Sequence, residues 1–290
     1  MTADLAASIY ARLAARAKQR SEDFQEVLTR YGLERFLYRL SLTPSREQMC
    51  LKGALLFNLW FDVAHRPTRD ADFLGFGPAD AAALEAAVRH ACAVKVEDGM
   101  TYDPASVRIR EIREEARYGG LRVKLQGRLK KARCPVQLDV GYGDAVTPGP
   151  QEAVYPTMLD DLPAPRLQVY PRETVVAEKL EAIASLGMTN SRMKDYFDLR
   201  VLARDGVVDP DVLATAIAAT FARRGTPLPD RLPLGLADEF ADDRLKQSQW
   251  NTFLSKNRLE APPLDVVVRE VRSFLDAPIA KAVSASRRRA

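Results

Sequence analysis

The chain has 290 residues, of which 47% are hydrophobic and 28% are charged, and its formal net charge is +4. This composition can bury a sizeable core, so it excludes a disordered or fibrous protein, and the length predicts one large domain or two smaller ones. The mild basic excess is compatible with nucleic-acid binding but is not diagnostic of it.

The sequence contains no signal for a membrane, a zinc site or a disulfide scaffold. No stretch approaches the roughly 18 apolar residues of a membrane-spanning helix, and the N-terminus lacks the apolar core of a signal peptide. The three cysteines, Cys50, Cys92 and Cys134, are far apart, with no C-x-x-C pair and only two histidines in the chain. We therefore expect a soluble cytoplasmic protein with reduced, buried thiols.

Residues 3–42 carry apolar side chains at helical spacing, separated by charged ones. This pattern predicts two or three amphipathic helices, with Ser21 and Asp23 at the start of the second. The sequence Thr43-Pro44-Ser45 then ends the helical pattern. We therefore expect an N-terminal helical segment, residues 1–45, ahead of a different architecture.

The next segment, residues 46–165, is predicted to form a mixed α/β core. An apolar run ends at Lys52, and residues 55–63 have the length and content of a buried helix. Gly53 at this junction lets backbone N–H groups approach a bound anion closely, where a helix N-terminus also favours negative charge. The backbone of Gly53 and Ala54 is therefore a candidate contact for triphosphate oxygens.

A loop and a pair of carboxylates follow this predicted helix. The loop, His65-Arg66-Pro67-Thr68-Arg69, supplies two guanidiniums suited to phosphate and a hydroxyl group close to Asp70. Asp70 and Asp72 are separated by one residue, so on a strand both carboxylates point to the same face. A hard divalent cation removes their repulsion, and oxygen ligands suit Mg²⁺ better than zinc. This pattern indicates a magnesium site that acts on phosphates.

Each part of this stretch also has a purely structural interpretation. A lone D-x-D is more often two solvated carboxylates than a metal site, and a lone Lys-Gly-Ala sequence is weaker still. The order of the parts is more specific than any one of them. The parts occur in the order strand, glycine turn, helix, arginine loop and D-x-D strand. This order places anion donors and metal ligands where one nucleotide could touch both.

Residues 94–143 change to the period of β-strands. Gly119-Gly120 predicts a turn, and residues 121–125 alternate apolar side chains with cations. The cationic face is either a solvated sheet surface or a basic surface that receives RNA backbone or triphosphate. The positive charge continues beyond this strand at Arg128, Lys130, Lys131 and Arg133.

A second apolar strand, residues 135–140, contains Asp139. A carboxylate in such a strand is costly unless it is paired or bound to a metal. Residues 147–171 then hold six prolines and little periodicity, which predicts a connection to a helical remainder, residues 166–290.

The helical remainder contains two charged patterns of interest. The apolar stripe that begins near Glu173 leaves Lys179 off it, so Lys179 would ordinarily be a solvated lysine. Further on, Lys194 and Asp198 stand at i and i+4 with Asp195 beside them, the spacing of a surface ion pair. Further helices are predicted around residues 212–223, 238–253 and 264–275, and residues 284–290 are predicted to be a disordered, arginine-rich tail.

Several motifs run nearly end to end along the chain: ERFLYRLS and LKGALLFNLW within 34–60, RPTRDADFLGFG at 66–77, QLDVGYGDAV at 137–146, YPRETVVAEKLEAI at 170–183 and NSRMKDYFDL at 190–199. Together they resemble the AbiEii/AbiGii-type nucleotidyltransferase toxins, members of the DNA polymerase β-like nucleotidyltransferase superfamily. The resemblance implies an α/β (α+β) fold, in which a polymerase β-like mixed sheet has flanking helices and a C-terminal helical domain.

The resemblance also implies a function. It indicates metal-dependent transfer of an NMP from an NTP to an acceptor, the tRNA 3′ end in some relatives, by the toxin of a toxin–antitoxin or abortive-infection system. The implied cofactor is Mg²⁺ or Mn²⁺, and the implied partners are NTP, tRNA or other RNA, and a cognate antitoxin protein, with no membrane. Two other classes stay open: a nucleotidyltransferase that acts on a protein or small molecule, and an inactive nucleotide- or RNA-binding relative.

The resemblance assigns roles to individual residues. Asp70, Asp72 and Asp139 match metal ligands, Asp139 being a ligand or a general base, and all three carboxylates are present, which favours an enzyme. Thr68 lies where some relatives are silenced by phosphorylation. Gly53-Ala54 departs from the family's Gly-Gly or Gly-Ser, so a serine contact to phosphate is missing. The remaining implied positions are Lys179, Asp195 and Asp198 as further catalytic residues, and Lys52, Gly53, Ala54, Arg66, Arg69, Lys179 and Lys194 as phosphate contacts.

Overall fold

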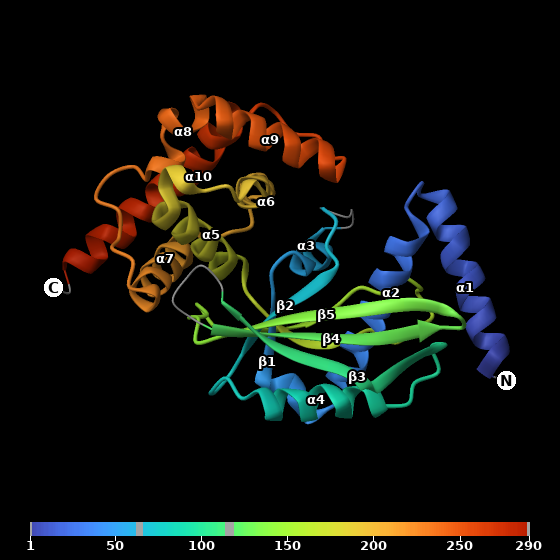
Figure 1. Cartoon of the computed structure of the whole chain (residues 1–290). Coiled ribbons are helices and arrows are strands. Elements are labelled where there is room, and N and C mark those ends of the chain that lie inside the picture. The colour runs from blue at the N-terminus through green and yellow to red at the C-terminus, as the bar shows by residue number, and fades with distance from the viewer. Residues whose placement is uncertain (1, 62–65, 114–118, 289–290) are drawn as a thin grey trace. The chain divides into compact units, whose positions relative to one another are not determined.

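The structure of the chain is a computed structural model, which describes residues 2–61, 66–113 and 119–288. It divides into two compact units (Figure 1). The first unit comprises Met1–Gly143 and Gln151–Val169, and the second comprises Asp144–Pro150 and Tyr170–Ala290. The first unit contains the sheet and the second is helical, which confirms the predicted α/β class.

The first unit begins with two helices, α1 (Thr2–Gln19) and α2 (Phe24–Ser41). Asp23 caps α2 by accepting a hydrogen bond from the backbone N–H of Glu26 at 2.9 Å, as the sequence predicted. A short 3-10 turn, η1 (Pro44–Gln48), then leads into the sheet.

Within the described residues the sheet has seven strands in the order β3-β4-β5-β2-β1-β7-β6. β1 is antiparallel to β2, β2 is parallel to β5, and β3, β4 and β5 form an antiparallel meander. The sheet is therefore mixed. The strand bounds are β1 (Met49–Lys52), β2 (Asp70–Gly75), β3 (Met100–Arg113), β4 (Gly119–Leu129), β5 (Ala132–Tyr142), β6 (Gln151–Val154) and β7 (Arg166–Val169).

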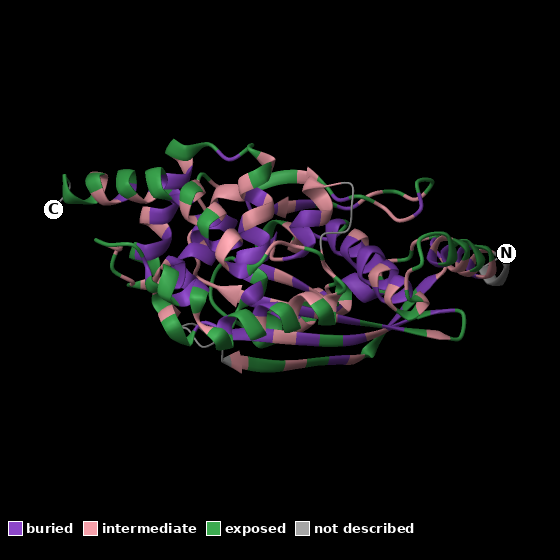
Figure 2. Cartoon of the chain, turned by 90° about the horizontal axis from the view of Figure 1, so that it is seen from above, coloured by how far each residue is buried: buried purple, intermediate pink, exposed green. Residues whose placement is uncertain are grey.

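The two faces of the β3-β4-β5 region differ because side chains alternate along each strand. One face is apolar and is covered by α2, which packs on β5, and by α4 (Ala81–Ala93), which packs on β3. A Cβ atom at Gly32 of α2 would lie 2.7 Å from the Cβ atom of Cys134, so only glycine allows α2 to come this close. The other face carries polar and charged residues, and buried and exposed positions alternate along the strands (Figure 2).

Two local predictions for this unit differ from the structure, one in where a helix ends and one in the kind of element. The helix expected over residues 55–63 is α3 (Leu55–Trp60), and Phe61 already has extended backbone, while residues 62–65 lie outside the described part of the chain. Gly119 and Gly120 are not a turn but the start of β4, where they pair with Arg113 and Ile112.

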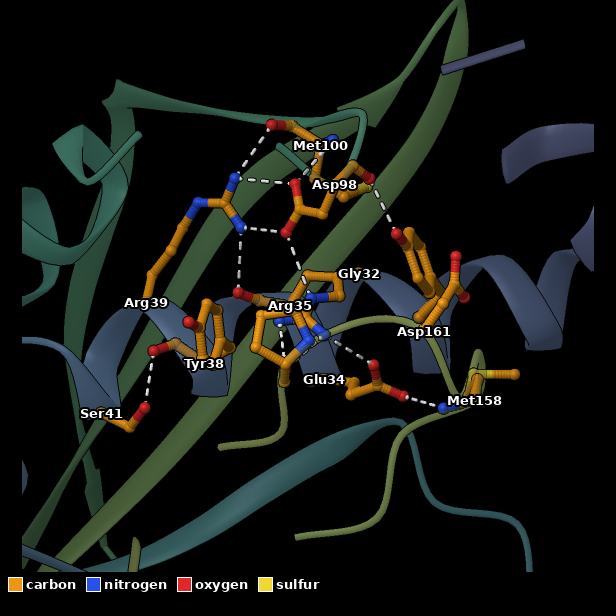
Figure 3. Close-up of polar contacts among 12 residues, drawn as sticks. Gly32, Glu34, Arg35, Tyr38, Arg39, Ser41, Asp98, Met100, Met158 and Asp161 are labelled. Carbon is orange, nitrogen blue, oxygen red and sulfur yellow. Dashed lines mark hydrogen bonds and ion pairs between the residues drawn. The ribbon is translucent and has the colours of Figure 1, made fainter. Parts of the chain in front are cut away.

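A buried ionic cluster fixes α2 to the segment before β3 (Figure 3). Arg39 donates hydrogen bonds from Nη1 and Nη2 to the carboxylate of Asp98 at 2.6 and 2.9 Å. Arg35 donates from Nε to the same carboxylate at 3.1 Å and from both Nη atoms to the carbonyl of Pro163. Arg35, Arg39 and Asp98 are almost completely buried, so water does not stabilise their charges. Each charge is therefore stabilised by the opposite charges within the cluster.

The second unit is a set of helices. Thr174 Oγ1 anchors the segment 144–150 to it by bonding both the N–H and the carbonyl of Thr147, at 2.9 and 2.8 Å. The helices are α5 (Arg172–Leu186), α6 (Met193–Asp205), α7 (Pro210–Arg224), α8 (Asp238–Asp242), α9 (Arg244–Asn257) and α10 (Leu264–Arg287).

The C-terminal helices differ from the prediction in two places. The helix expected over 238–253 is interrupted at Asp243, which caps α9 by accepting from the backbone N–H of Lys246 at 2.9 Å. Instead of a disordered tail from residue 284, α10 continues to Arg287, and residues 289–290 lie outside the described part. None of the helices in the described ranges combines the length and apolar content needed to cross a bilayer. The side chains of the three cysteines are buried, as expected.

Candidate active site

Three carboxylates meet on the polar face of the sheet. Asp70 and Asp72 lie on β2 and Asp139 on β5, and the parallel register places Asp72 directly beside Asp139. One oxygen atom from each lies within 4.8 Å of the others. The Asp139 side chain is only 12% exposed. Three carboxylate oxygens at this spacing form a donor set that fits a hard divalent cation.

Gly53 packs directly against this carboxylate triad, Asp70, Asp72 and Asp139. Lys52, the last residue of β1, pairs with Asp72 across the sheet, and Gly53 follows with a φ of 74°. A Cβ atom at Gly53 would lie 2.1 Å from Oδ2 of Asp72. Both the left-handed backbone and the lack of space require glycine here. The backbone between β1 and α3 therefore approaches the triad closely.

Thr68 holds one member of the triad. Its Oγ1 donates a hydrogen bond to Oδ1 of Asp70 at 2.8 Å. The contact joins the arginine loop to the start of β2, so the hydroxyl lies in the site rather than in bulk solvent. It therefore restrains the orientation of the Asp70 carboxylate.

Arg122 on β4 is a member of the site that the sequence did not single out. Its Nε and Nη2 donate to Oδ1 and Oδ2 of Asp139 at 2.8 and 2.6 Å. The hydrogen bond to Asp139, together with the negative charges of the triad, raises the pKa of Arg122 above its ordinary value. The turn at Lys130-Lys131 between β4 and β5 sets the register that pairs Arg122 with Asp139. Two lysines are not a turn signal, so the sequence did not indicate this pair.

The arginine loop is described only in part. His65 lies outside the described residues, and Arg66 is partly buried beside that gap. Arg69 is 78% exposed and donates to Glu26 of α2 at 3.1 Å. The Arg69 guanidinium group therefore contacts α2 and not the carboxylate triad.

A second charged cluster lies within the helical unit. Lys179 of α5 donates from Nζ to Asp195 and Asp198 of α6 at 2.9 and 2.8 Å. Both aspartate side chains are completely buried, and Lys179 is 11% exposed, so Lys179 is not a solvated lysine. Arg192 adds a hydrogen bond to Asp195 at 2.6 Å. Lys194, in contrast, is exposed.

The electrostatics of this Lys179–Asp195–Asp198 cluster favour the charged form of Asp195. Burial by itself raises the pKa of Asp195, but the positive charges of Lys179 and Arg192 and their hydrogen bonds outweigh burial, so that the pKa lies below its ordinary value. The two carboxylates therefore hold the Lys179 ammonium group in one position.

The sequence profile of the family described as "Nucleotidyl transferase AbiEii toxin, Type IV TA system" matches residues 35–277. The chain belongs to the AbiEii family. The match spans both units and includes the triad, Thr68, Gly53 and the Lys179 cluster. As a member of the AbiEii family the chain is a nucleotidyltransferase of a type IV toxin–antitoxin system, and the family implies an NTP substrate and an antitoxin partner.

The fold of the chain is similar to that of a solved structure. The crystal structure of JHP933 from Helicobacter pylori superposes with a TM-score of 0.51 at 17% identity, covering 91% of this chain and 95% of that one. A second H. pylori structure, described as a "putative nucleotidyltransferase", has a TM-score of 0.44 at 19% identity and covers 90% and 96% of the two chains. At these identities the likeness to JHP933 concerns the fold alone. A search of curated protein sequences found no match.

Proposed function

We propose that this AbiEii nucleotidyltransferase uses Mg²⁺ or Mn²⁺, held by Asp70, Asp72 and Asp139, to transfer an NMP from an NTP to the 3′ end of an RNA, with tRNA as the first candidate. The observation that carries the proposal is the convergence of the three carboxylates, with one oxygen from each within 4.8 Å of the others. A divalent cation there would orient the α-phosphate and lower the pKa of the acceptor hydroxyl.

The proposed reaction is an in-line displacement at phosphorus. The acceptor 3′ hydroxyl oxygen forms a bond to the α-phosphorus, the bond from that phosphorus to the bridging oxygen of the β-phosphate breaks, and pyrophosphate leaves with that electron pair. The hydroxyl proton passes to solvent when Asp139 serves as a metal ligand, or to Asp139 when that carboxylate serves instead as the general base.

Residues around the triad would prepare this step. Thr68 fixes the Asp70 carboxylate through its 2.8 Å hydrogen bond. The close backbone approach at Gly53 places the turn between β1 and α3 beside Asp72. With the family motif, this supports assigning Lys52, Gly53 and Ala54 to the triphosphate. Arg66 and Arg69 are further candidate phosphate contacts, proposed from the family motif.

The helical unit would contribute a second group of functional residues. Lys179, Asp195 and Asp198 are proposed as further catalytic residues and Lys179 and Lys194 as phosphate contacts, on the resemblance to the family. The fixed position of the Lys179 ammonium group between two buried carboxylates supports a role that needs a precisely placed cation.

The test is incubation of the purified protein with Mg²⁺, each α-³²P-labelled NTP in turn and total tRNA. The Asp70→Ala/Asp72→Ala double variant serves as the control. Label in tRNA with the wild type alone supports the proposal and reveals the preferred base. Unlabelled tRNA despite NTP binding would redirect the proposal to a protein or small-molecule acceptor, or to an inactive nucleotide-binding protein.

We further propose that the antitoxin silences the enzyme by phosphorylation of Thr68. The Thr68 hydroxyl touches Asp70, so a phosphate on it would add a strong negative charge beside three carboxylates and repel the incoming NTP. The test is incubation with the neighbouring-gene product and ATP, followed by mass spectrometry for a mass gain at Thr68. A Thr68→Ala variant that the antitoxin still blocks would refute this mechanism.

A further inference from the structure

The carboxylate triad shares its sheet face with cations on the two strands that follow beyond β5. The strand register sets them in cross-strand rows. One row runs from β3 to β2 through Arg110, Arg122, Asp139 and Asp72. The next row runs through Arg108, Lys124, Gln137 and Asp70.

The outer cations of these rows are available to a partner. Arg108, Arg110, Lys124 and, further along β4, Arg128 are all exposed. Arg108 donates to the carbonyls of Ala105 and Val107 at 2.7 and 2.8 Å, which leaves its positive charge uncompensated. Among the described residues, no carboxylate forms an ion pair with Arg110, Lys124 or Arg128.

One further carboxylate lies at the far end of this face. Asp103 pairs in register with Gln126 of β4. Its Oδ1 accepts the backbone N–H of Ala105 at 2.9 Å, so it serves the local bulge in β3. The face formed by Arg108, Arg110, Lys124 and Arg128, here called the basic track, is therefore strongly cationic, whereas the opposite face of β4 is buried and apolar.

We propose that the basic track binds the phosphodiester backbone of the single-stranded 3′ end of the acceptor RNA. The inference rests on the proposed function and names the surface on which the acceptor lies. In an in-line displacement the attacking hydroxyl and the leaving pyrophosphate stand on opposite sides of the α-phosphorus. The acceptor must therefore arrive from the side opposite the triphosphate.

The order of the strands places the proposed triphosphate contacts and the basic track on opposite sides of the carboxylate triad. Lys52 and Gly53, the proposed contacts of the triphosphate, lie at the end of β1. This strand borders β2 on one side of the carboxylates. β4 and β3 lie on the other side, beyond β5. With strands about 4.8 Å apart, Arg110 stands about 10 Å from Asp139, two strands away. This spacing suits a phosphate upstream of a 3′ hydroxyl placed at the triad.

The basic track is suited to backbone rather than to bases. Its members are three arginines and one lysine, whose charged groups pair with phosphate oxygens, and no aromatic residue lies on the two cross-strand rows to stack a base. Binding should therefore tolerate sequence changes and depend strongly on salt.

The experiment uses the full chain with Arg108, Arg110 and Lys124 all changed to Gln. The control variant removes the same charge from exposed cations elsewhere, with Lys18, Lys95 and Arg204 all changed to Gln. Fluorescence anisotropy measures binding to a labelled RNA hairpin with a single-stranded 3′ tail, over a series of salt concentrations. Titration with a non-hydrolysable NTP analogue and thermal unfolding are measured on the same samples.

We expect the track variant to bind the tailed RNA on the order of tenfold more weakly than wild type, with the slope of log affinity against log salt reduced by about 2. The control variant should lose much less affinity for the tailed RNA. The NTP analogue should bind all three proteins equally, and their unfolding temperatures should agree. A blunt RNA duplex should show little difference between the track and control variants.

Three outcomes would overturn the inference. Equal loss of RNA binding in the track and control variants would show that only net charge matters. Loss of NTP binding with retained RNA binding would place the triphosphate on the track. If the wild type and the track variant transfer labelled NMP to RNA equally well at limiting RNA, the basic track does not bind the acceptor, while the proposed function stands. If the wild type neither binds nor labels RNA, the proposed function itself fails.

Discussion

Arg122 holds both carboxylate oxygens of Asp139, with Nε–Oδ1 and Nη2–Oδ2 distances of 2.8 and 2.6 Å. Asp139 is also the member of the triad contributed by a different strand from Asp70 and Asp72. A guanidinium group therefore already compensates the third carboxylate of a candidate metal site. A divalent cation must bind against this positive charge, so Arg122 should set the metal affinity of the site.

Replacing Arg122 by Gln should increase the affinity for Mn²⁺ by about tenfold, because it removes a partly exposed positive charge near the metal. The free Mn²⁺ signal in electron paramagnetic resonance measures this directly and does not depend on activity. Arg122→Lys keeps the charge and should stay close to wild type. Weaker Mn²⁺ binding in Arg122→Gln would instead mean that the arginine mainly positions Asp139.

Gly53→Ala should abolish transfer, because its Cβ atom would meet Oδ2 of Asp72 at 2.1 Å. We expect a loss of activity of about a hundredfold or more, from a misplaced carboxylate in a site that needs accurate geometry. Gly77→Ala is the matched control, since Gly77 also has a positive φ, 89°, but no atom within 4 Å of its added Cβ. Both variants should lose about 1 kcal/mol of stability from backbone strain. The overlap with Asp72 should add to this loss in Gly53→Ala only. Transfer rates and urea unfolding separate the two effects, and equal activity in both would contradict the packing argument.

Lys179→Met should destabilise the helical unit by about 3–5 kcal/mol, because it removes the cation between two completely buried carboxylates. The same substitution at exposed Lys194 should change the free energy of unfolding by no more than about 0.5 kcal/mol. Chemical denaturation of both variants makes the comparison. Similar stability for the two variants would show that the Lys179 cluster is not a structural ion-pair network.

Thr68→Glu should weaken NTP binding, since it places a permanent negative charge where the hydroxyl now contacts Asp70. We expect a reduction on the order of tenfold, because one added charge opposes a polyanionic ligand near a site of like sign. Thr68→Gln is the uncharged control of similar size and should bind NTP more tightly than Thr68→Glu. Titration with an NTP analogue in the presence of metal gives both values; equal affinities would exclude charge at this position as the inhibitory signal.

Glu34→Gln should change how stability depends on pH. Burial raises the pKa of Glu34 to about 7 from an ordinary value of 4.5, although Arg35 and the Met158 N–H oppose the rise (Figure 3). Between these two values the folded state binds the proton that the unfolded state has released. The stabilisation from the protonated Glu34 is therefore complete below about pH 4.5 and is lost as the pH rises through about 7.

Glu34→Gln lacks this titration. Relative to wild type, the variant should gain on the order of 1–3 kcal/mol of stability between pH 5 and pH 8. Urea denaturation at a series of pH values measures the difference. Parallel stability curves for the two proteins would mean that Glu34 is charged across this range.

Much of the candidate site was predictable from sequence because its signals are local. The one-residue spacing of Asp70 and Asp72 places both on one face of a strand whatever strand lies next to it. Asp139 stood out as a carboxylate within an apolar strand, and the end-to-end motifs indicated the family that the profile match confirms. Helix caps such as Asp23 were likewise predictable, because they depend on neighbouring residues in the chain.

Other features depended on contacts between residues far apart in the sequence. The periodicity that left Lys179 off the apolar stripe suggested solvent, whereas the packing of α6 on α5 buries it between Asp195 and Asp198. A periodic pattern reports which face is apolar, but not whether a buried polar partner lies opposite a charge.

The sequence by itself determined the α/β class, the family and the carboxylates that form the triad, since these follow from short-range pattern and motif. Only the tertiary structure decided which charges meet. Strand register paired Arg122 with Asp139, the left-handed backbone at Gly53 brought it against Asp72, and the strand order placed Arg110 and its neighbours on one side of the triad. The physical reason is that side-chain period fixes a face, while the partner across that face depends on register and on the order of strands in the sheet.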